Sequence, residues 1–273
     1  MVSQEQRRRQ LAREKFLRQQ QRRTSARRKS RMRNSVIASV LGVIVIGSVA
    51  LYTTGVLKND DKANASSQTT PSASPSASKA PDPCEKAAAG SVKKLSWKKE
   101  PAMSIDTSAN YTMKLATTCG DIGIALKTAA APHTVNSFDF LAAQGFFDHT
   151  KCHRLTTNGI YVLQCGDPTG TGSGGPGYTI PDENLKDKSL KGGVYPAGTV
   201  AMANTGQKHT GGSQFFLVYQ DSQLPASYTP FGTIDAAGMK VLKKIAAAGE
   251  NTGAGDGAPN ATVVINKATV AKS

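Results

Sequence analysis

A glycine-rich stretch, IYVLQCGDPTGTGSGGPGY at residues 160–178, has the composition of a phosphate-binding loop. Gly170, Gly172 and Gly175 satisfy the G-x-G-x-x-G pattern of dinucleotide-binding proteins. A dinucleotide site also needs a helix that begins at these glycines, because the first amides of that helix bind the pyrophosphate. Here prolines interrupt the stretch, no helical period follows it, and no Gly-Lys-Ser/Thr completes a P-loop. The glycines therefore need an explanation other than nucleotide binding.

Nucleophilic and metal chemistry find equally weak support in the sequence. The segment GGSQF at residues 211–215 resembles the nucleophile elbow of a hydrolase but lacks the closing glycine of G-x-S-x-G. Adjacent Cys152 and His153 would point to opposite faces of a strand, which argues against a zinc site. We expect neither a metal ion nor a cofactor.

The cysteines indicate an oxidising compartment. Their number is even and none belongs to a C-x-x-C pair, which favours disulfide bonds. Four cysteines allow three connectivities, and the residues alone do not choose among them. The four are Cys84, Cys119, Cys152 and Cys165.

Positive charge is concentrated at the N-terminus and is followed by an apolar run. Residues 1–33 hold 13 of the 34 Lys and Arg residues against two Glu, so they carry +11 of the total charge of +15. Residues 36–57 contain no charged side chain, and their length suits a membrane-spanning helix. A signal peptide is the alternative, but its apolar core is shorter and lies nearer the N-terminus. We expect residues 1–34 to be a cytoplasmic tail and residues 35–58 a single-pass anchor in the cell membrane.

The next segment is a tether to an extracytoplasmic domain. Residues 59–83 are dominated by Ser, Ala, Pro and Thr, a composition with too little apolar surface to form a core. Residues 59–107 are thus predicted to be a disordered linker and a pre-barrel segment. The basic tail could bind nucleic acid, but so close to the anchor, binding to anionic lipid headgroups is the simpler interpretation.

The remaining residues, 108–273, are predicted to fold as one domain of mainly β structure with two helices. Alternating runs at 111–116 and 122–126 indicate a hairpin. Helical spacing follows up to Gly145 and recurs at residues 236–249. The other apolar segments are short and strand-like, which favours a closed antiparallel barrel.

Six segments of this domain carry a family resemblance. In chain order they are TVNSFDFLAAQGFFD, CHRL, LQCGDPTGTGSGGPGY, GTVAMANTG, GGSQFFLVY and YTPFGTI. They are similar to successive signatures of the cyclophilin family of peptidyl-prolyl cis-trans isomerases. The resemblance implies a closed eight-stranded barrel, a monomer, and isomerisation of Xaa-Pro bonds in extracytoplasmic proteins during their folding. It also implies that the glycine-rich stretch is a surface loop beside the substrate groove.

The resemblance assigns roles to particular residues. Arg154 stands at the position of the catalytic arginine, and Gln164 at that of the glutamine that supports it. A guanidinium suits this role because it is always charged and presents several donors in one plane. Tyr228 replaces the usual histidine, and Gln223 replaces a tryptophan associated with tight cyclosporin binding. The implied substrate-binding residues are Tyr161, Leu163, Ala203, Asn204, Gln214, Phe216, Leu224 and Tyr228.

Cyclophilin architecture also constrains the disulfides. The strands that hold CHRL and VLQC form an antiparallel hairpin in that family, which would bring Cys152 close to Cys165. Cys84 and Cys119 would then form a second bond that fastens the pre-barrel segment to the barrel. The alternative function is a proline-peptide-binding chaperone module with little catalysis, against which Arg154 argues.

Overall fold

The computed structural model describes residues 81–273. The basic tail, the predicted anchor at 35–58 and most of the tether lie outside the described residues. Between residues 81 and 273, no helix combines the length and apolar character that a membrane span requires.

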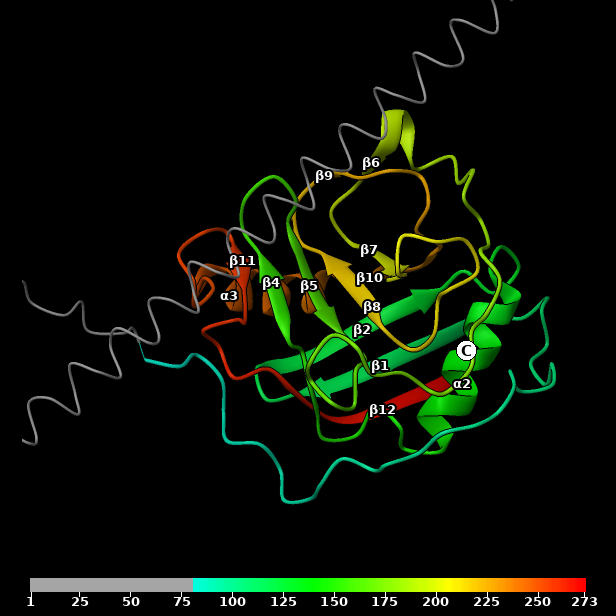
Figure 1. The fold of residues 1–273 in the computed structure, drawn as a ribbon, viewed down its shortest axis with the longest axis horizontal. Helices are drawn as coiled ribbons and strands as arrows, with labels where there is room; N and C mark the ends of the chain where they lie inside the picture. The colour runs from blue at the N-terminus through cyan, green and yellow to red at the C-terminus, as the bar shows by residue number, and fades with distance from the viewer. Residues whose placement is uncertain (1–80) are drawn as a thin grey trace, which may run out of the picture. The chain divides into compact units, whose positions relative to one another are not determined.

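The described part of the chain is mainly β with two α-helices, as the sequence predicts (Figure 1). The helices are α2 (Pro132–Ala143) and α3 (Ala236–Ala247), and a 3-10 turn covers Lys191–Gly193. The strands are β1 (Tyr111–Thr117), β2 (Gly120–Leu126), β3 (Thr150–Lys151), β4 (Arg154–Thr156), β5 (Val162–Cys165), β6 (Val194–Tyr195), β7 (Thr199–Met202), β8 (Phe215–Val218), β9 (Ser222–Gln223), β10 (Pro230–Ile234), β11 (Asp256–Gly257) and β12 (Val264–Lys272).

Ten of these strands form one curled sheet in the order β11-β4-β5-β8-β7-β10-β2-β1-β12-β3, and β6 pairs with β9 separately. β3 and β4 stand near opposite ends of this order, although only Cys152 and His153 separate them in the chain. Within the described residues no ladder joins the two ends of the sheet. The closed eight-stranded barrel is therefore not confirmed and stays a prediction.

The first hairpin and both helices confirm the periodicities of the sequence. β1 pairs with β2 from Tyr111–Leu126 to Thr117–Gly120, and the alternate side chains of β1 are buried. Helix α2 has a proline in its first turn and buries Val135, Phe138 and Leu141, in keeping with the fixed φ of proline at a helix start. Asp235 caps α3 by accepting a hydrogen bond from the Gly238 amide, 2.6 Å. The helices lie on different sides of the strands, α2 against β12 and α3 against β2 (Figure 1).

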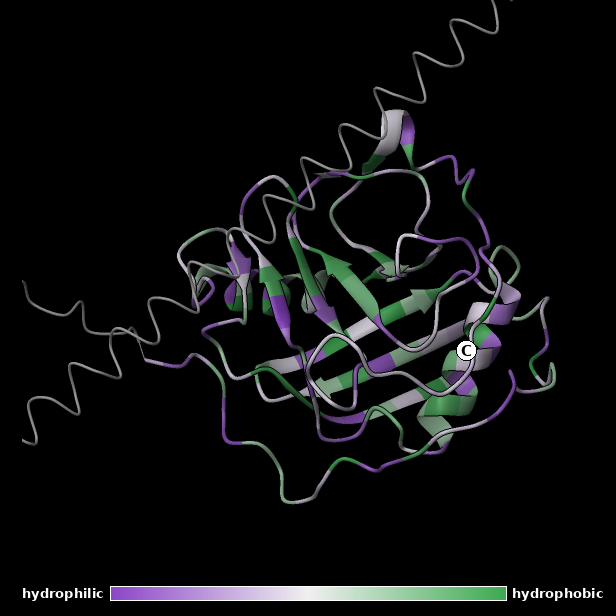
Figure 2. Ribbon diagram, viewed as in Figure 1, coloured by the Kyte–Doolittle hydropathy of each residue, from purple (hydrophilic) through white to green (hydrophobic). Residues whose placement is uncertain are grey.

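Two clusters of buried apolar side chains form the interior, and Figure 2 shows that the strands of the sheet are rich in hydrophobic residues. The main core surrounds Phe138, whose ring lies 4.6 Å from that of Phe231 and 5.5 Å from that of Phe215. The smaller cluster contains Val162, Tyr195, Ala201, Phe216 and Val218. Because side chains alternate along a strand, β5 and β8 contribute to both clusters. The smaller cluster forms the base of the candidate site.

Residues 81–107, here called the strap, form no regular helix or strand yet contact the domain along their length. Figure 1 shows them in cyan, running past β12 toward α2. A disulfide joins Cys84 to Cys119, and the Trp97 ring packs 5.0 Å from that of Phe140. The side chain of Asn136 in α2 donates to the carbonyls of Pro101 and Ala102. The second disulfide joins Cys152 to Cys165, so both expected pairings are confirmed.

Candidate active site

One row of side chains across four strands assembles the site. Arg154 on β4 is opposite Gln164 on β5, Gln164 is opposite Phe216 on β8, and Phe216 is opposite Ala201 on β7. Directly paired residues of neighbouring strands share one face of a sheet. The register therefore places a guanidinium, an amide and an aromatic ring side by side.

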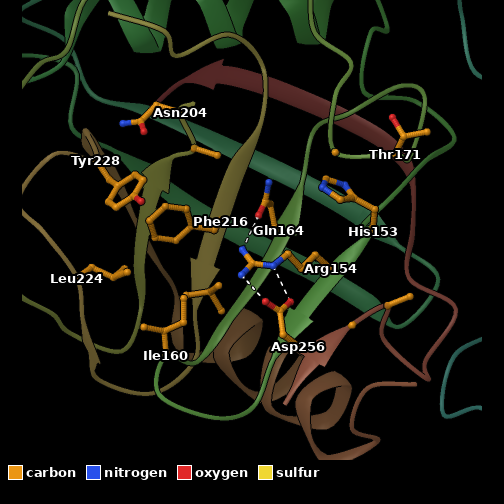
Figure 3. Close-up of a pocket in the computed structure, with 15 residues that line it drawn as sticks. His153, Arg154, Ile160, Gln164, Thr171, Asn204, Phe216, Leu224, Tyr228 and Asp256 are labelled. Atoms are coloured by element: carbon orange, nitrogen blue, oxygen red, sulfur yellow. Dashed lines mark hydrogen bonds and ion pairs between the residues drawn. The ribbon is translucent and has the colours of Figure 1, made fainter. Parts of the chain in front are cut away.

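Arg154, Gln164 and Phe216 line a cavity of about 530 Å³, here called the Arg154 pocket (Figure 3). Figure 3 shows Arg154 near the centre, with Phe216 and Tyr228 on one side and His153 on the other. Seven of the residues that the sequence assigns to the site line this cavity, namely Arg154, Gln164, Ala203, Asn204, Phe216, Leu224 and Tyr228.

The Arg154 guanidinium is held by two partners. Its Nε donates to Asp256 Oδ1 at 2.7 Å and its Nη2 to Asp256 Oδ2 at 2.8 Å, while Nη1 donates to Gln164 Oε1 at 3.1 Å. A guanidinium has five N–H groups, so one N–H on each terminal nitrogen stays free of these bonds. The hydrogen bonds that Arg154 donates to Asp256 raise the pKa of Arg154 and lower the pKa of Asp256. The cation is thus fixed in place with two donors to spare.

A chain of amide hydrogen bonds continues from Arg154 into the glycine-rich loop, which is the part of the glycine-rich stretch that follows β5, residues 167–178. Gln164 Nε2 donates to Gln214 Oε1 at 2.9 Å, and Gln214 Nε2 donates to the Gly174 carbonyl at 2.9 Å. Each side-chain amide accepts at one end and donates at the other, which fixes the direction of both. Gln214 lines a second cavity beside the Arg154 pocket.

The apolar side of the pocket is built from three aromatic rings that pack on one another. The rings of Phe216 and Tyr228 lie edge to face, 5.5 Å apart, and Tyr195 packs behind them with its hydroxyl donating to the Tyr228 carbonyl at 2.8 Å. Asn204 borders the pocket and donates to the Ser227 carbonyl at 2.8 Å. This surface can accept a small apolar ring, while polar groups stand at its edge.

Two expected pocket residues lie elsewhere. Leu163 is fully buried in the main core opposite Leu155 and Leu217, because strand alternation turns it away from the face that Gln164 occupies. The Tyr161 ring packs against Tyr219 at 5.9 Å and does not line the pocket. The residues that take their place are Ile160 and Val162.

The glycine-rich loop is organised by its own carboxylate. Buried Asp167 accepts hydrogen bonds from the amides of Thr169, Thr171, Gly172 and Gly174. Burial alone would raise the pKa of Asp167, but these bonds and the Thr169 hydroxyl lower it to about 2. Gly172 has a φ of 83°, which favours glycine. The amides that could have held a phosphate are already occupied, and the loop borders the groove as expected.

Sequence reasoning missed Asp256 and left His153 without a role at the site. Asp256 lies in a glycine-rich segment 102 residues beyond Arg154, and no motif marks it. Its segment is shaped by Glu250, which accepts from the amides of Thr252 and Gly255. His153 lines the pocket, and within residues 81–273 its buried ring nitrogens have no hydrogen-bond partner. Burial lowers the pKa of His153, so a neutral ring stands beside Arg154.

The site lies next to the disulfide between Cys152 and Cys165. Cys165 follows Gln164 directly, and Cys152 stands two residues before Arg154. Because Cys152 is bonded to Cys165, it cannot serve as a zinc ligand.

Arg154 is the only arginine after Arg33, whereas all other cationic side chains in that span are lysines or histidines. A planar, multidentate cation is therefore placed only at this site in residues 34–273.

Comparisons with known proteins agree with this geometry. A family model described as cyclophilin type peptidyl-prolyl cis-trans isomerase/CLD matches residues 112–270. The probable peptidyl-prolyl cis-trans isomerase B of Mycobacterium leprae is 49% identical over 199 residues, covering 70% of this chain and 63% of that protein. The protein of the same name from Mycobacterium tuberculosis H37Rv is 50% identical over 165 residues, covering 58% and 53%. The chain thus spans less than two thirds of these relatives.

A solved structure of a Cryptosporidium parvum cyclophilin type peptidyl-prolyl cis-trans isomerase has a TM-score of 0.49 and 25% identity, covering 60% of this chain and 99% of that one. The family model, in contrast, extends over more than half of the present sequence, from Thr112 to Val270. This chain belongs to the cyclophilin-type peptidyl-prolyl cis-trans isomerase family.

Proposed function

We propose that the protein catalyses cis-trans isomerisation of Xaa-Pro bonds in polypeptide substrates. The observation that carries this proposal is the Arg154 guanidinium, which is held by Asp256 and Gln164 beside the Phe216 ring and keeps two N–H groups free. Rotation about an Xaa-Pro bond is slow because amide resonance is lost, at a barrier of about 18–20 kcal/mol. No covalent bond breaks and no proton has to leave.

The pocket residues divide the work of this reaction. Phe216, Leu224 and Tyr228 hold the proline ring, so that the residue before it rotates against a fixed group. As the amide twists, its nitrogen becomes pyramidal and basic, and a free N–H of Arg154 stabilises it. Asp256 and Gln164 fix the guanidinium beforehand, so little reorganisation is needed in the twisted state.

The test is an isomerisation assay on the purified full chain in mild detergent. The protein should accelerate exchange in short Xaa-Pro peptides, and Arg154→Ala should lower kcat/KM by about a hundredfold, the usual effect of removing one preorganised donor. Far-ultraviolet circular dichroism and the melting temperature check that the variant folds. A folded wild-type protein that binds such peptides without accelerating exchange would instead support the peptide-binding chaperone.

We further propose that the isomerase acts outside the cytoplasm while anchored in the cell membrane, on proteins that fold there. The uncharged run at residues 36–57 and the basic residues before it support the anchor. The disulfides of the domain support an oxidising compartment, since such bonds rarely persist in the cytosol.

A further inference from the structure

A second cavity of about 1040 Å³, here called the flanking cavity, continues the groove beyond the Arg154 pocket. The two cavities share Gln164, Gly172, Ala203 and Asn204 as lining residues. A peptide with its proline against Phe216 therefore has a continuous path into the flanking cavity. Its other walls are the glycine-rich loop, the segments around Thr205 and Gln214, and part of the strap.

All charged residues that line the flanking cavity come from the strap, namely Lys98, Lys99 and Glu100. Glu100 is engaged, because its Oε1 lies 2.6 Å from Nδ1 of His133. Lys98 and Lys99 are exposed, and neither has an ion-pair partner within residues 81–273. The side chains that the loops contribute are uncharged. Within residues 81–273, this wall of the cavity therefore has two ammonium groups without an ion-pair partner, against one carboxylate that is already in contact with His133.

The backbone that carries these lysines is held on both sides. Before them, the Trp97 amide donates to the Pro176 carbonyl of the glycine-rich loop at 2.8 Å, and its ring packs on Phe140. After them, Asn136 bonds the strap at Pro101 and Ala102. The position of both lysines beside the groove is thus a consequence of the fold, although their long side chains keep their own freedom.

We propose that Lys98 and Lys99 make the groove selective for substrates with an acidic side chain on one flank of the proline, within a few residues of it. The inference rests on the proposed isomerase function and specifies its substrate class. A carboxylate in the flanking cavity gains attraction from two ammonium groups. Such exposed pairs are individually weak and are screened by salt, so the preference is modest and largest at low ionic strength.

The test compares peptides that contain one Xaa-Pro bond and differ only in Glu against Gln, placed two or three residues before or after the proline. With the full chain in detergent at low salt, kcat/KM for the preferred Glu peptide should exceed that for its Gln partner by about three- to tenfold, mainly through KM. The Lys98→Gln/Lys99→Gln double variant should bring this ratio close to one. In the wild type, a salt concentration of 0.5 M should have a similar effect.

A matched control separates the local effect from the loss of net charge. Lys86 and Lys94 lie on the same strap, are exposed and do not line the cavity. Lys86→Gln/Lys94→Gln removes the same charge and should preserve the Glu preference. If this control loses the preference as fully as the double variant, the preference comes from net charge and the inference is wrong.

Binding can be followed independently of turnover. Trp97 is the only tryptophan of the chain and directly precedes Lys98, so its emission reports both the docked strap and occupation of the groove. Titration with the Glu peptide should shift this emission at lower concentration than titration with the Gln peptide. Turnover of both peptides at equal kcat/KM would refute the lysine selectivity and leave the isomerase intact. Turnover of neither peptide would refute the isomerase and this inference together.

Discussion

At the scale of single residues, the site depends on how one arginine is held. Asp256 binds the Nε and Nη2 edge of Arg154, and Gln164 binds Nη1, so the guanidinium is held from two sides and one N–H on each terminal nitrogen is left for another partner. Bidentate carboxylate pairs of this kind restrict a guanidinium more strongly than a single contact does. Asp256 is therefore a positioning residue.

We expect Asp256→Asn to lower kcat about tenfold while KM changes less than twofold, because an amide can accept from only one of the two N–H groups. Steady-state kinetics on a neutral Xaa-Pro peptide separates the two constants. Since Arg154 lowers the pKa of Asp256, the wild-type rate should show no titration of this carboxyl above its ordinary pKa of about 4.

Asp121→Asn is the matched control for this prediction. The Asp121 side chain is 58% exposed, close to the 55% of Asp256, and it pairs with Lys114 away from the site. The Asp121→Asn substitution should leave kcat unchanged. A faster Asp256→Asn enzyme would mean that the carboxylate competes with the substrate for Arg154 and does not position it.

Asp167 gives a second prediction at this scale, on stability. Its folded pKa of about 2 lies below the ordinary value of 3.8, so its contribution to folding is present above pH 4 and is lost as the pH falls toward 2. This shift corresponds to about 2 kcal/mol. Asp167→Asn should lower the free energy of unfolding by about that amount at pH 7. Urea denaturation should show the difference between the two proteins shrinking between pH 4 and pH 2; a constant difference would contradict the assignment.

At the scale of elements, apolar periodicity predicted the first hairpin and both helices, and the family motifs predicted the main residues of the site. The hairpin of β1 and β2 and both helices follow directly from apolar spacing, and motif positions brought Arg154, Gln164 and Phe216 into one pocket. The family motifs did not predict correctly toward which face of the sheet every side chain points. Leu163 is adjacent to Gln164, and alternation along β5 sends the two side chains to opposite faces.

Contacts between segments distant in the chain were not predictable. Asp256 reaches the groove from the two-residue strand β11 and Lys98 reaches it from the strap, and neither segment is long enough or regular enough to show a period in the sequence. Their positions depend on long-range bonds, such as that of Trp97 to Pro176, that no local pattern contains.

The two disulfides should have different effects, because they fasten different elements. Cys152–Cys165 links the ends of the segments that carry Arg154 and Gln164, whereas Cys84–Cys119 links the strap to the first hairpin. With sequence separations of 13 and 35, chain entropy gives about 3 and about 4 kcal/mol.

We expect serine replacement of Cys152 and Cys165 to lower both the melting temperature and kcat on a neutral peptide. Serine replacement of Cys84 and Cys119 should instead loosen the strap, which Trp97 emission and limited proteolysis within residues 81–107 would detect. The strap contributes no lining residue to the cavity that contains Arg154, so kcat on the neutral peptide should change less. Equal loss of kcat in both variants would contradict this division.

At the scale of the whole molecule, the strap connects the predicted tether to the catalytic groove. The chain reaches the domain near Cys84, is bonded there to the first hairpin, packs Trp97 on Phe140 of α2 and then borders the flanking cavity. The segment that the sequence predicts as the end of a linker and a pre-barrel segment fastened by a disulfide is thus also a wall of the groove. Cleavage before residue 81 should leave the described domain and its groove complete.

This gives a prediction for intact cells. Protease added outside should cut within residues 59–83, whose composition predicts no packed structure, and release a soluble C-terminal fragment. The fragment should retain isomerase activity and the preference for Glu peptides, because the cut removes neither the strap lysines nor the disulfides. Immunoblotting with an antibody to the domain follows the release, and an intact cytoplasmic protein shows that the cells did not lyse. Full protection of the domain until the cells are opened would place it on the cytoplasmic side and reverse the proposed orientation.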